Sequence, residues 1–301
     1  MIDTEVHVVY RAWRVETNTA HRLVEGITSR EHSGDLLIEE MDRAGVHQAF
    51  LIGYDGYDFE PYMRRFDSSP DEFFGGRAYT LHYARKYPDR FHYFTTLRDP
   101  RHPASFDRLR DEVERGAVGI KIFPNYLGVA LDGDDMIPVY ELCAEHRLKV
   151  IIGLEDTDPP RTNSHQEYFS ATARILKRHP ELRFQFNHGG AVHLPSPEAD
   201  ALFELARGRA NVFVSTSYLG GPMLNWKDEW RYPFPEYLRQ LEVLYRGVGP
   251  EQLVWATDWP WLEEWTKYPQ LLDSVRDHGN FMREGDLAAF LGGNAERYMR
   301  G

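Results

Sequence analysis

MIDTEVHV (residues 1–8) and QLVWATDWPW (residues 252–261) give the strongest indication of how this chain folds. Each has apolar residues followed by carboxylate or imidazole side chains, which can bind a metal or transfer a proton. Glu5 and His7 are two positions apart, so both point to the same face if the first stretch is a strand. A carboxylate and an imidazole on one face, joined by Asp258 from a distant strand, form a metal site or an acid/base site. The two strands must then be neighbours, and a closed barrel makes its first and last strands neighbours.

Between and around these two stretches, short runs rich in β-branched and aromatic residues recur along the chain, and amphipathic stretches of helical period separate them. The predicted strands are 2–9, 46–53, 91–97, 117–123, 149–154, 182–187, 211–216 and 252–257. The predicted helices are 35–44, 71–87, 103–115, 136–146, 166–178, 198–207, 235–245, 269–277 and 284–298.

Strands that alternate with helices indicate parallel βα units, and their number and the length of 301 residues fit a (β/α)8 TIM barrel. An open, doubly wound sheet is the alternative, but no G-x-G-x-x-G follows the first strand. No linker or repeat marks a second domain, so we expect one domain over residues 1–301. The long irregular stretches 54–69 and 218–234 follow strands and should lie at the mouth of the barrel, where active sites sit.

The composition narrows the class of partner. The net charge is −12, without a basic run, which disfavours nucleic acid and anionic membrane surfaces. The apolar runs are too short to span a bilayer, and the N-terminus lacks the pattern of a signal peptide. The single cysteine, Cys143, lies in a helical run and is predicted to be a buried core residue. We therefore expect a cytoplasmic protein that acts on a small molecule; the sequence leaves a homo-oligomer open.

Polar side chains end many of the predicted strands. A lone Asp258 is compatible with a helix cap, and a lone His188 with a buried core histidine. Their convergence at one end of one barrel favours a functional site instead. The set comprises Glu5, His7, Lys121, Asn125, Glu155, Asp156, Asp158, His188, Ser215, Ser217 and Asp258.

Five segments carry a resemblance to a known family. DTEVH (3–7) resembles the D-x-H/E-x-H opening of the amidohydrolase superfamily, and GIKIFP (119–124), FNHGG (186–190), ATDWPW (256–261) and GGNAER (292–297) resemble its later motifs in the same order. Within that superfamily the chain is similar to the amidohydrolase-related branch. That branch includes aminocarboxymuconate-semialdehyde decarboxylase, γ-resorcylate decarboxylase and small lactonases.

The resemblance implies one divalent metal, Zn or Mn, held by Glu5, His7 and Asp258, with His188 as the catalytic histidine beside it. The family usually adds a histidine at the end of strand 5, where this chain has Gly153. Glu155 shares a face with Gly153 if the strand stays extended, so it is a candidate for the missing ligand. Otherwise water or His165 fills the position, or the metal is bound weakly or not at all.

Further residues are candidates for binding substrate. Lys121 resembles a family lysine that pairs with a carboxylate or meets an anionic substrate; a structural ion pair is the alternative. Arg11 could bind a carboxylate, and Tyr126 and Trp259 could line an aromatic pocket, although loop packing explains each as well.

The leading prediction is an enzyme that hydrolyses a small lactone, ester, thioester or amide with a metal-activated water, in which Asp258 also accepts the water proton. The alternative is non-oxidative decarboxylation of an aromatic or enoic acid, because the E-x-H opening resembles that of some decarboxylases. A metal-poor barrel that acts through His188 or only binds a ligand is the third option, motivated by Gly153.

Overall fold

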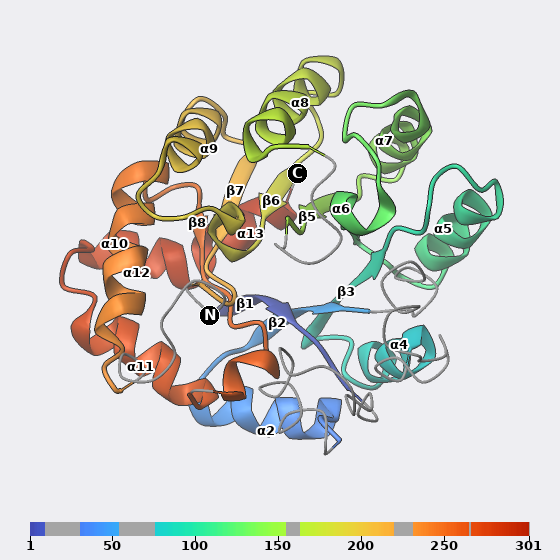
Figure 1. Ribbon diagram of the computed structural model, residues 1–301. Coiled ribbons are helices and arrows are strands. Elements are labelled where there is room, and N and C mark those ends of the chain that lie inside the picture. Colours follow the sequence, from blue (N-terminus) through green and yellow to red (C-terminus); the bar gives the residue numbers. More distant parts are fainter. Residues whose placement is uncertain (10–30, 54–75, 155–162, 220–230, 265, 301) are drawn as a thin grey trace, which may run out of the picture.

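The computed structural model describes residues 1–9, 31–53, 76–154, 163–219, 231–264 and 266–300. Eight parallel strands, paired in the order β1 to β8, form a nearly closed barrel with helices around it (Figure 1). The prediction of a (β/α)8 barrel is confirmed, and the open doubly wound sheet is excluded.

Every strand lies inside the run predicted for it. The strands are β1 (Ile2–Val6), β2 (Gln48–Ile52), β3 (Phe91–Thr96), β4 (Gly119–Ile122), β5 (Lys149–Ile152), β6 (Phe184–Phe186), β7 (Val212–Ser215) and β8 (Leu253–Val254).

Apart from the single turn Pro124–Leu127, the helices lie within or overlap the predicted amphipathic stretches. They are α2 (Gly34–Ala44), α4 (Gly76–Lys86), α5 (Ala104–Glu114), α6 (Pro124–Leu127), α7 (Ile137–Glu145), α8 (His165–Arg178), α9 (Pro197–Arg207), α10 (Pro235–Val248), α11 (Tyr268–His278), α12 (Glu284–Ala288) and α13 (Asn294–Met299). Serine side chains begin several of them: Ser33 accepts from the Leu36 amide, and Ser164 forms a capping box with Glu167. The helix predicted over 284–298 is interrupted by a π-helical turn, Ala289–Gly293, between α12 and α13.

Two hydrophobic clusters hold the barrel. The larger one packs the helices against the outer face of the strands. The smaller one draws residues from six of the strands and from α13, which places it inside the barrel. Its buried members are Ile2, Phe50, Ile52, Phe94, Ile151, Phe213, Val254, Ala295 and Tyr298. Cys143 is buried, as predicted, and burial raises the pKa of its thiol.

Backbone hydrogen bonds join the two ends of the chain at the seam of the barrel. The Thr4 amide donates to the Trp255 carbonyl (3.1 Å), and the His7 amide donates to the Trp259 carbonyl (2.7 Å). The Asp258 amide donates back to the Glu5 carbonyl (3.0 Å). The first strand and the segment after β8 are therefore neighbours, as the chemistry of their side chains requires.

An irregularity in β1 decides which side chains face the centre. The register with β2 shifts between Asp3 and Val6. Ile2 lies in the interior cluster, so strict alternation would turn Glu5 outward. The shift instead sends Val6 to the outer cluster and leaves Glu5 and His7 facing the centre.

The helices in the described part of the chain include none that is long and apolar enough to cross a bilayer. The long stretch 54–69 lies outside the described residues, as does most of 218–234.

Candidate metal centre

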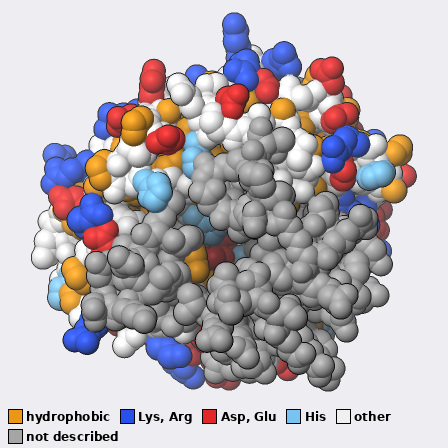
Figure 2. Space-filling model, viewed as in Figure 1, with side chains coloured by type: hydrophobic (Ala, Val, Ile, Leu, Met, Phe, Trp, Pro, Cys, Tyr) orange, Lys and Arg blue, Asp and Glu red, His pale blue; other side chains and the backbone are white. Residues whose placement is uncertain are grey.

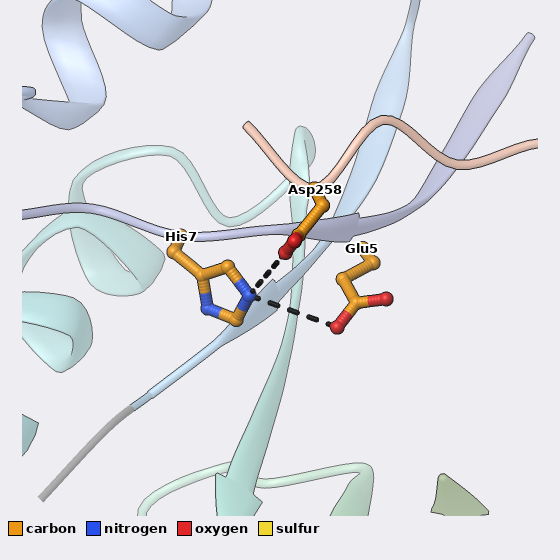
Figure 3. A group of neighbouring side chains, drawn as sticks. All are labelled: Glu5, His7 and Asp258. Carbon is orange, nitrogen blue, oxygen red and sulfur yellow. Dashed lines mark hydrogen bonds and ion pairs between the residues drawn. The ribbon is translucent and has the colours of Figure 1, made fainter. Parts of the chain in front are cut away.

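Glu5, His7 and Asp258 form a compact, buried group in which one ligand atom of each lies within 4.8 Å of the others. His7 Nε2 lies 3.1 Å from Asp258 Oδ1 and 3.7 Å from Glu5 Oε1. Figure 3 shows both carboxylates on the same side of the His7 ring, each joined by a dashed line to the same ring nitrogen. In Figure 2 acidic and histidine atoms are visible at the floor of a hollow near the centre of this face.

The ring of His7 is oriented by a second hydrogen bond. Its Nδ1 lies 3.1 Å from the carbonyl oxygen of Ile52, which can only accept, so Nδ1 carries the proton. In the neutral imidazole the lone pair is then on Nε2, the nitrogen that faces both carboxylates. A metal-ligating histidine has the same arrangement, with one ring nitrogen tied to a backbone carbonyl and the other directed at the ion.

The charges of the group are strongly coupled. Burial lowers the pKa of His7, but its bonds to Asp258 and Glu5 outweigh burial and raise the pKa overall. Burial also works against ionisation of Glu5, yet the Lys121 ammonium holds the pKa of that carboxyl well below its usual range. Burial and the charge of Glu5 raise the pKa of Asp258. Two carboxylates this close therefore need cations beside them to stay ionised together.

Asp3 supports the turn that carries Asp258. Its Oδ1 accepts from the amides of Glu5 and Thr257, both at 3.1 Å, and its Oδ2 accepts from Thr257 Oγ1 (2.6 Å) and Tyr268 Oη (2.8 Å). Burial raises the pKa of Asp3 to about 7, against the four hydrogen bonds that favour its carboxylate. Asp258 itself has a left-handed backbone (φ 61°), a strained conformation for a residue other than glycine. Asp3 fixes that turn by binding Thr257, the residue before it.

His188 follows β6 and is half-buried near the same group. Its Nδ1 lies 2.9 Å from the Ser217 carbonyl, so this nitrogen is the donor and Nε2 is the nitrogen that can exchange a proton. Ser217 Oγ lies 3.2 Å from both the amide nitrogen and Nδ1 of His188. Burial and Lys121 have the larger effects on the pKa of Glu5, but the charge of His188 also lowers it, which places the ring within electrostatic reach of the group.

A chain of polar side chains extends from Ser217 into the barrel. Ser215 Oγ lies 3.0 Å from Ser217 Oγ and donates to Asn187 Oδ1 (3.3 Å). Gln185 Nε2 donates to the same Asn187 oxygen (2.9 Å). The sequence marks Ser215 and Ser217 only as polar ends of a strand; their link to His188 requires the neighbouring strand and is visible only in the fold.

Lys121 is fully buried, and its Nζ lies 2.5 Å from Glu5 Oε1. It therefore forms an ion pair with a carboxylate of the group. Tyr126 is half-buried, and its ring lies 5.4 Å from that of Phe123. Trp259 is buried, packs edge-on against His32 (5.3 Å) and donates from Nε1 to Glu263 Oε1 (3.1 Å).

Some residues that the sequence predicts for the site lie outside the described residues. These are Arg11, Glu155, Asp156 and Asp158. His165 is the first residue of α8, where it is buried and stacks on Phe169 with ring centroids 6.1 Å apart. No motif or spacing indicated His32 and Glu263, whose side chains lie 3.3 Å apart beside Trp259.

The donor set fits a divalent metal. It offers two carboxylate oxygens and one imidazole nitrogen, the ligand types that Zn and Mn accept. Among the described residues, Glu5 Oε2 is buried without a hydrogen-bond partner, which is costly unless another group binds it. Together the fold and this group define a (β/α)8 barrel with a buried Glu/His/Asp site suited to a metal ion.

Comparisons with known proteins agree with a (β/α)8-barrel enzyme of this kind. The model of the amidohydrolase family matches residues 2–300, so the chain belongs to the amidohydrolase family and is an enzyme of it. A search of curated proteins gave no match.

Solved structures share the fold at low identity. An amidohydrolase from Burkholderia multivorans with bound zinc has a TM-score of 0.72 and 16% identity, over 99% of this chain and 98% of that one. A probable 2-pyrone-4,6-dicarboxylic acid hydrolase from Acinetobacter baumannii with citric acid bound has a TM-score of 0.68 and 14% identity, over 100% and 99%. A 2,6-dihydroxybenzoate decarboxylase in complex with 2,6-dihydroxybenzoate has a TM-score of 0.63 and 15% identity, over 100% and 99%.

Proposed function

We propose that this chain is a metal-dependent hydrolase of a small lactone, ester, thioester or amide, with one Zn or Mn ion held by Glu5, His7 and Asp258. The observation that carries the proposal is the buried group of two carboxylates and one oriented imidazole within 4.8 Å. The zinc in the Burkholderia structure and the hydrolase from Acinetobacter, both of the same fold, support it.

A bound ion would polarise a substrate carbonyl and acidify water, the chemistry that hydrolysis needs. Asp258 has a second carboxylate oxygen besides the one facing His7, so it can accept the proton of the attacking water. His188, with Nδ1 held by Ser217, presents Nε2 to stabilise an oxyanion or to protonate the leaving group. We propose Lys121, Arg11, Tyr126 and Trp259 as residues that help to bind the substrate, which includes a carboxylate if the two cations take part.

Non-oxidative decarboxylation of an aromatic or enoic acid is the second candidate. The buried ammonium of Lys121 beside the group favours an anionic substrate, and 2,6-dihydroxybenzoate decarboxylase shares the fold. In that reaction His188 would supply the proton that replaces the departing carboxyl group.

The two candidates separate in one set of assays on protein purified without chelator. The proposal predicts about one Zn or Mn per chain, hydrolysis of members of a lactone, ester, thioester and amide panel, loss of turnover after chelation and recovery with added metal. Release of CO2 from aromatic or enoic acids, without hydrolysis of the panel, would establish the second candidate. Turnover that survives complete removal of metal would leave the third option, a barrel that acts through His188 alone.

A further inference from the structure

Lys121 has an unusual position for a lysine. Its side chain is fully buried on β4, its Nζ lies 2.5 Å from Glu5 Oε1, and the same Nζ lies 4.5 Å from the centre of the Phe123 ring. Lysine is almost never fully buried unless it is paired. Glu5 Oε1 is also the oxygen 3.7 Å from His7 Nε2, so the ammonium contacts the carboxylate atom that faces His7.

We propose that Lys121 is a built-in competitor of the metal: it occupies Glu5 while the centre is empty and weakens the affinity of the centre for a divalent ion. The inference rests on the proposed function, because it concerns the ion that Glu5, His7 and Asp258 would hold. It assigns to Lys121 control over metal affinity and places its ammonium beside the ion, where an anionic part of a substrate can bind.

The charge balance gives the direction of the effect. Glu5 and Asp258 together contribute two negative charges, and Lys121 cancels one of them at contact distance. A lysine held on a barrel strand cannot move far, so a cation that binds Glu5 has the ammonium as a close neighbour. Repulsion between cations is strong in a buried site, where little water screens it.

The ion pair also keeps Glu5 ready to bind. Without a cation, a buried carboxylate is costly, and it would protonate or turn away. Lys121 therefore stabilises the empty centre while it opposes filling it. Loss of Lys121 should have two opposite results: a less stable empty protein and a tighter metal site.

The test compares the wild type with Lys121→Met, which keeps an unbranched apolar side chain but lacks the ammonium, and with Lys121→Gln as a second neutral variant. Lys149→Met is the matched control. Lys149 is the first residue of β5, the next strand, and its Nζ donates to the Arg147 carbonyl. The control therefore removes one lysine from a neighbouring strand. Each protein is stripped of metal, and Zn²⁺ and Mn²⁺ affinities are measured by competition with a chromophoric chelator, alongside melting temperatures with and without Zn²⁺.

We expect both Lys121 variants to bind Zn²⁺ on the order of 100-fold more tightly than the wild type, because a unit charge next to the ion is removed. Their empty forms should melt lower, and Zn²⁺ should raise their melting temperatures more than that of the wild type. Lys149→Met should bind Zn²⁺ like the wild type.

Unchanged or weaker Zn²⁺ affinity in a folded Lys121 variant, with a wild type that binds metal, would overturn this inference alone. Tighter binding in Lys149→Met as well would also overturn it, since the effect would then be one of net charge. If neither the wild type nor the Lys121 variants bound Zn²⁺ or Mn²⁺, the metal role in the proposed function would fail too.

Discussion

His7 Nε2 lies 3.1 Å from Asp258 Oδ1, although the two residues are 251 positions apart in the sequence. The contact exists because the segment after β8 pairs with β1 through the amides of His7 and Asp258. The segment after the last strand thus completes a site that begins at the end of the first strand. Glu5, His7 and Asp258 therefore supply backbone hydrogen bonds of the seam as well as the side chains of the site.

The first prediction concerns Asp258 as a ligand. Asp258→Asn keeps the size of the side chain but removes its charge. Loss of a residue that only hydrogen-bonds to a metal ligand lowers metal affinity roughly 10–100-fold, so loss of a ligand charge should lower it at least as much. Turnover should fall with it, since the same carboxylate is proposed to accept the water proton. Metal content by elemental analysis and kcat measure the two effects.

Asp132→Asn is the control, since Asp132 is paired with Arg174 on α8 by a contact of 2.5 Å and has no place in the centre. It should retain metal and turnover. Full metal and full activity in Asp258→Asn would show that the ligand assignment is wrong.

The second prediction concerns His188, which we propose acts on protons and does not hold the ion. His188→Asn should leave metal content nearly intact and lower kcat by about 10²-fold or more, the usual scale for a general acid/base. Elemental analysis and steady-state kinetics separate the two properties.

His179→Asn provides the comparison, because His179 follows α8 and lies 3.6 Å from Glu181. Its kcat should match that of the wild type. If His188→Asn loses metal together with activity, His188 is a ligand and its proposed role as a proton donor has to be abandoned.

The barrel could be predicted from the sequence because its signals are local. Buried parallel strands appear as short apolar runs, and every run in this chain contains one observed strand. The pairing of Glu5 and His7 also followed from their spacing, although the physical reason is less simple. The register shift after Asp3 turns Glu5 inward, and alternation counted from Ile2 would have placed it outside.

The support of the site could not be predicted, since it depends on contacts between distant elements. For Lys121 the sequence allowed either a substrate contact or an ion pair, and only the fold shows that its Nζ contacts Glu5. Asp3 belongs to the same motif as Glu5, but its partners Thr257 and Tyr268 come from the other end of the chain. No periodicity or spacing indicates such pairs.

The third prediction concerns stability and pH at the contact between α2 and α4. Lys86 and Tyr87 donate hydrogen bonds to Asp35, and these lower the pKa of Asp35 below its ordinary value of 3.8. A depressed carboxyl pKa stabilises the fold above the unfolded pKa, and that stability is lost as pH falls through the folded pKa. Asp35→Asn should therefore lower the melting temperature at pH 7, by about 2 °C or less because the pair is exposed, and the gap should begin to shrink as the pH falls below about 4, toward the lowered pKa of Asp35.

Asp107→Asn is the control for this pair, since Asp107 also lies in the first turn of a helix, α5, but 84% of its side chain is exposed. It shares any effect of the helix dipole, and its contact with Arg110 is longer, at 3.4 Å, so a larger loss in Asp35→Asn reports on the closer contacts with Lys86 and Tyr87. A gap that stays the same from pH 7 to pH 3 would show that ionisation of Asp35 contributes nothing.

The last prediction addresses the end of β5, where the resemblance implies a histidine and the chain has Gly153. Ile151 faces the interior of the barrel, so Gly153, two residues on, continues the same face and is buried. We propose that Glu155, which lies outside the described residues, supplies the missing ligand or hydrogen-bond acceptor. A third carboxylate beside Glu5 and Asp258 would favour a hard cation and make bound water less acidic, because more of the ion's charge is neutralised. Glu155→Gln should then weaken metal binding and move the optimum of kcat to lower pH, whereas Glu167→Gln, a change at the N-terminus of α8, should do neither. If Glu155→Gln leaves both the metal affinity and the pH profile unchanged, Gly153 marks a true vacancy, and the option of a metal-poor barrel gains in strength.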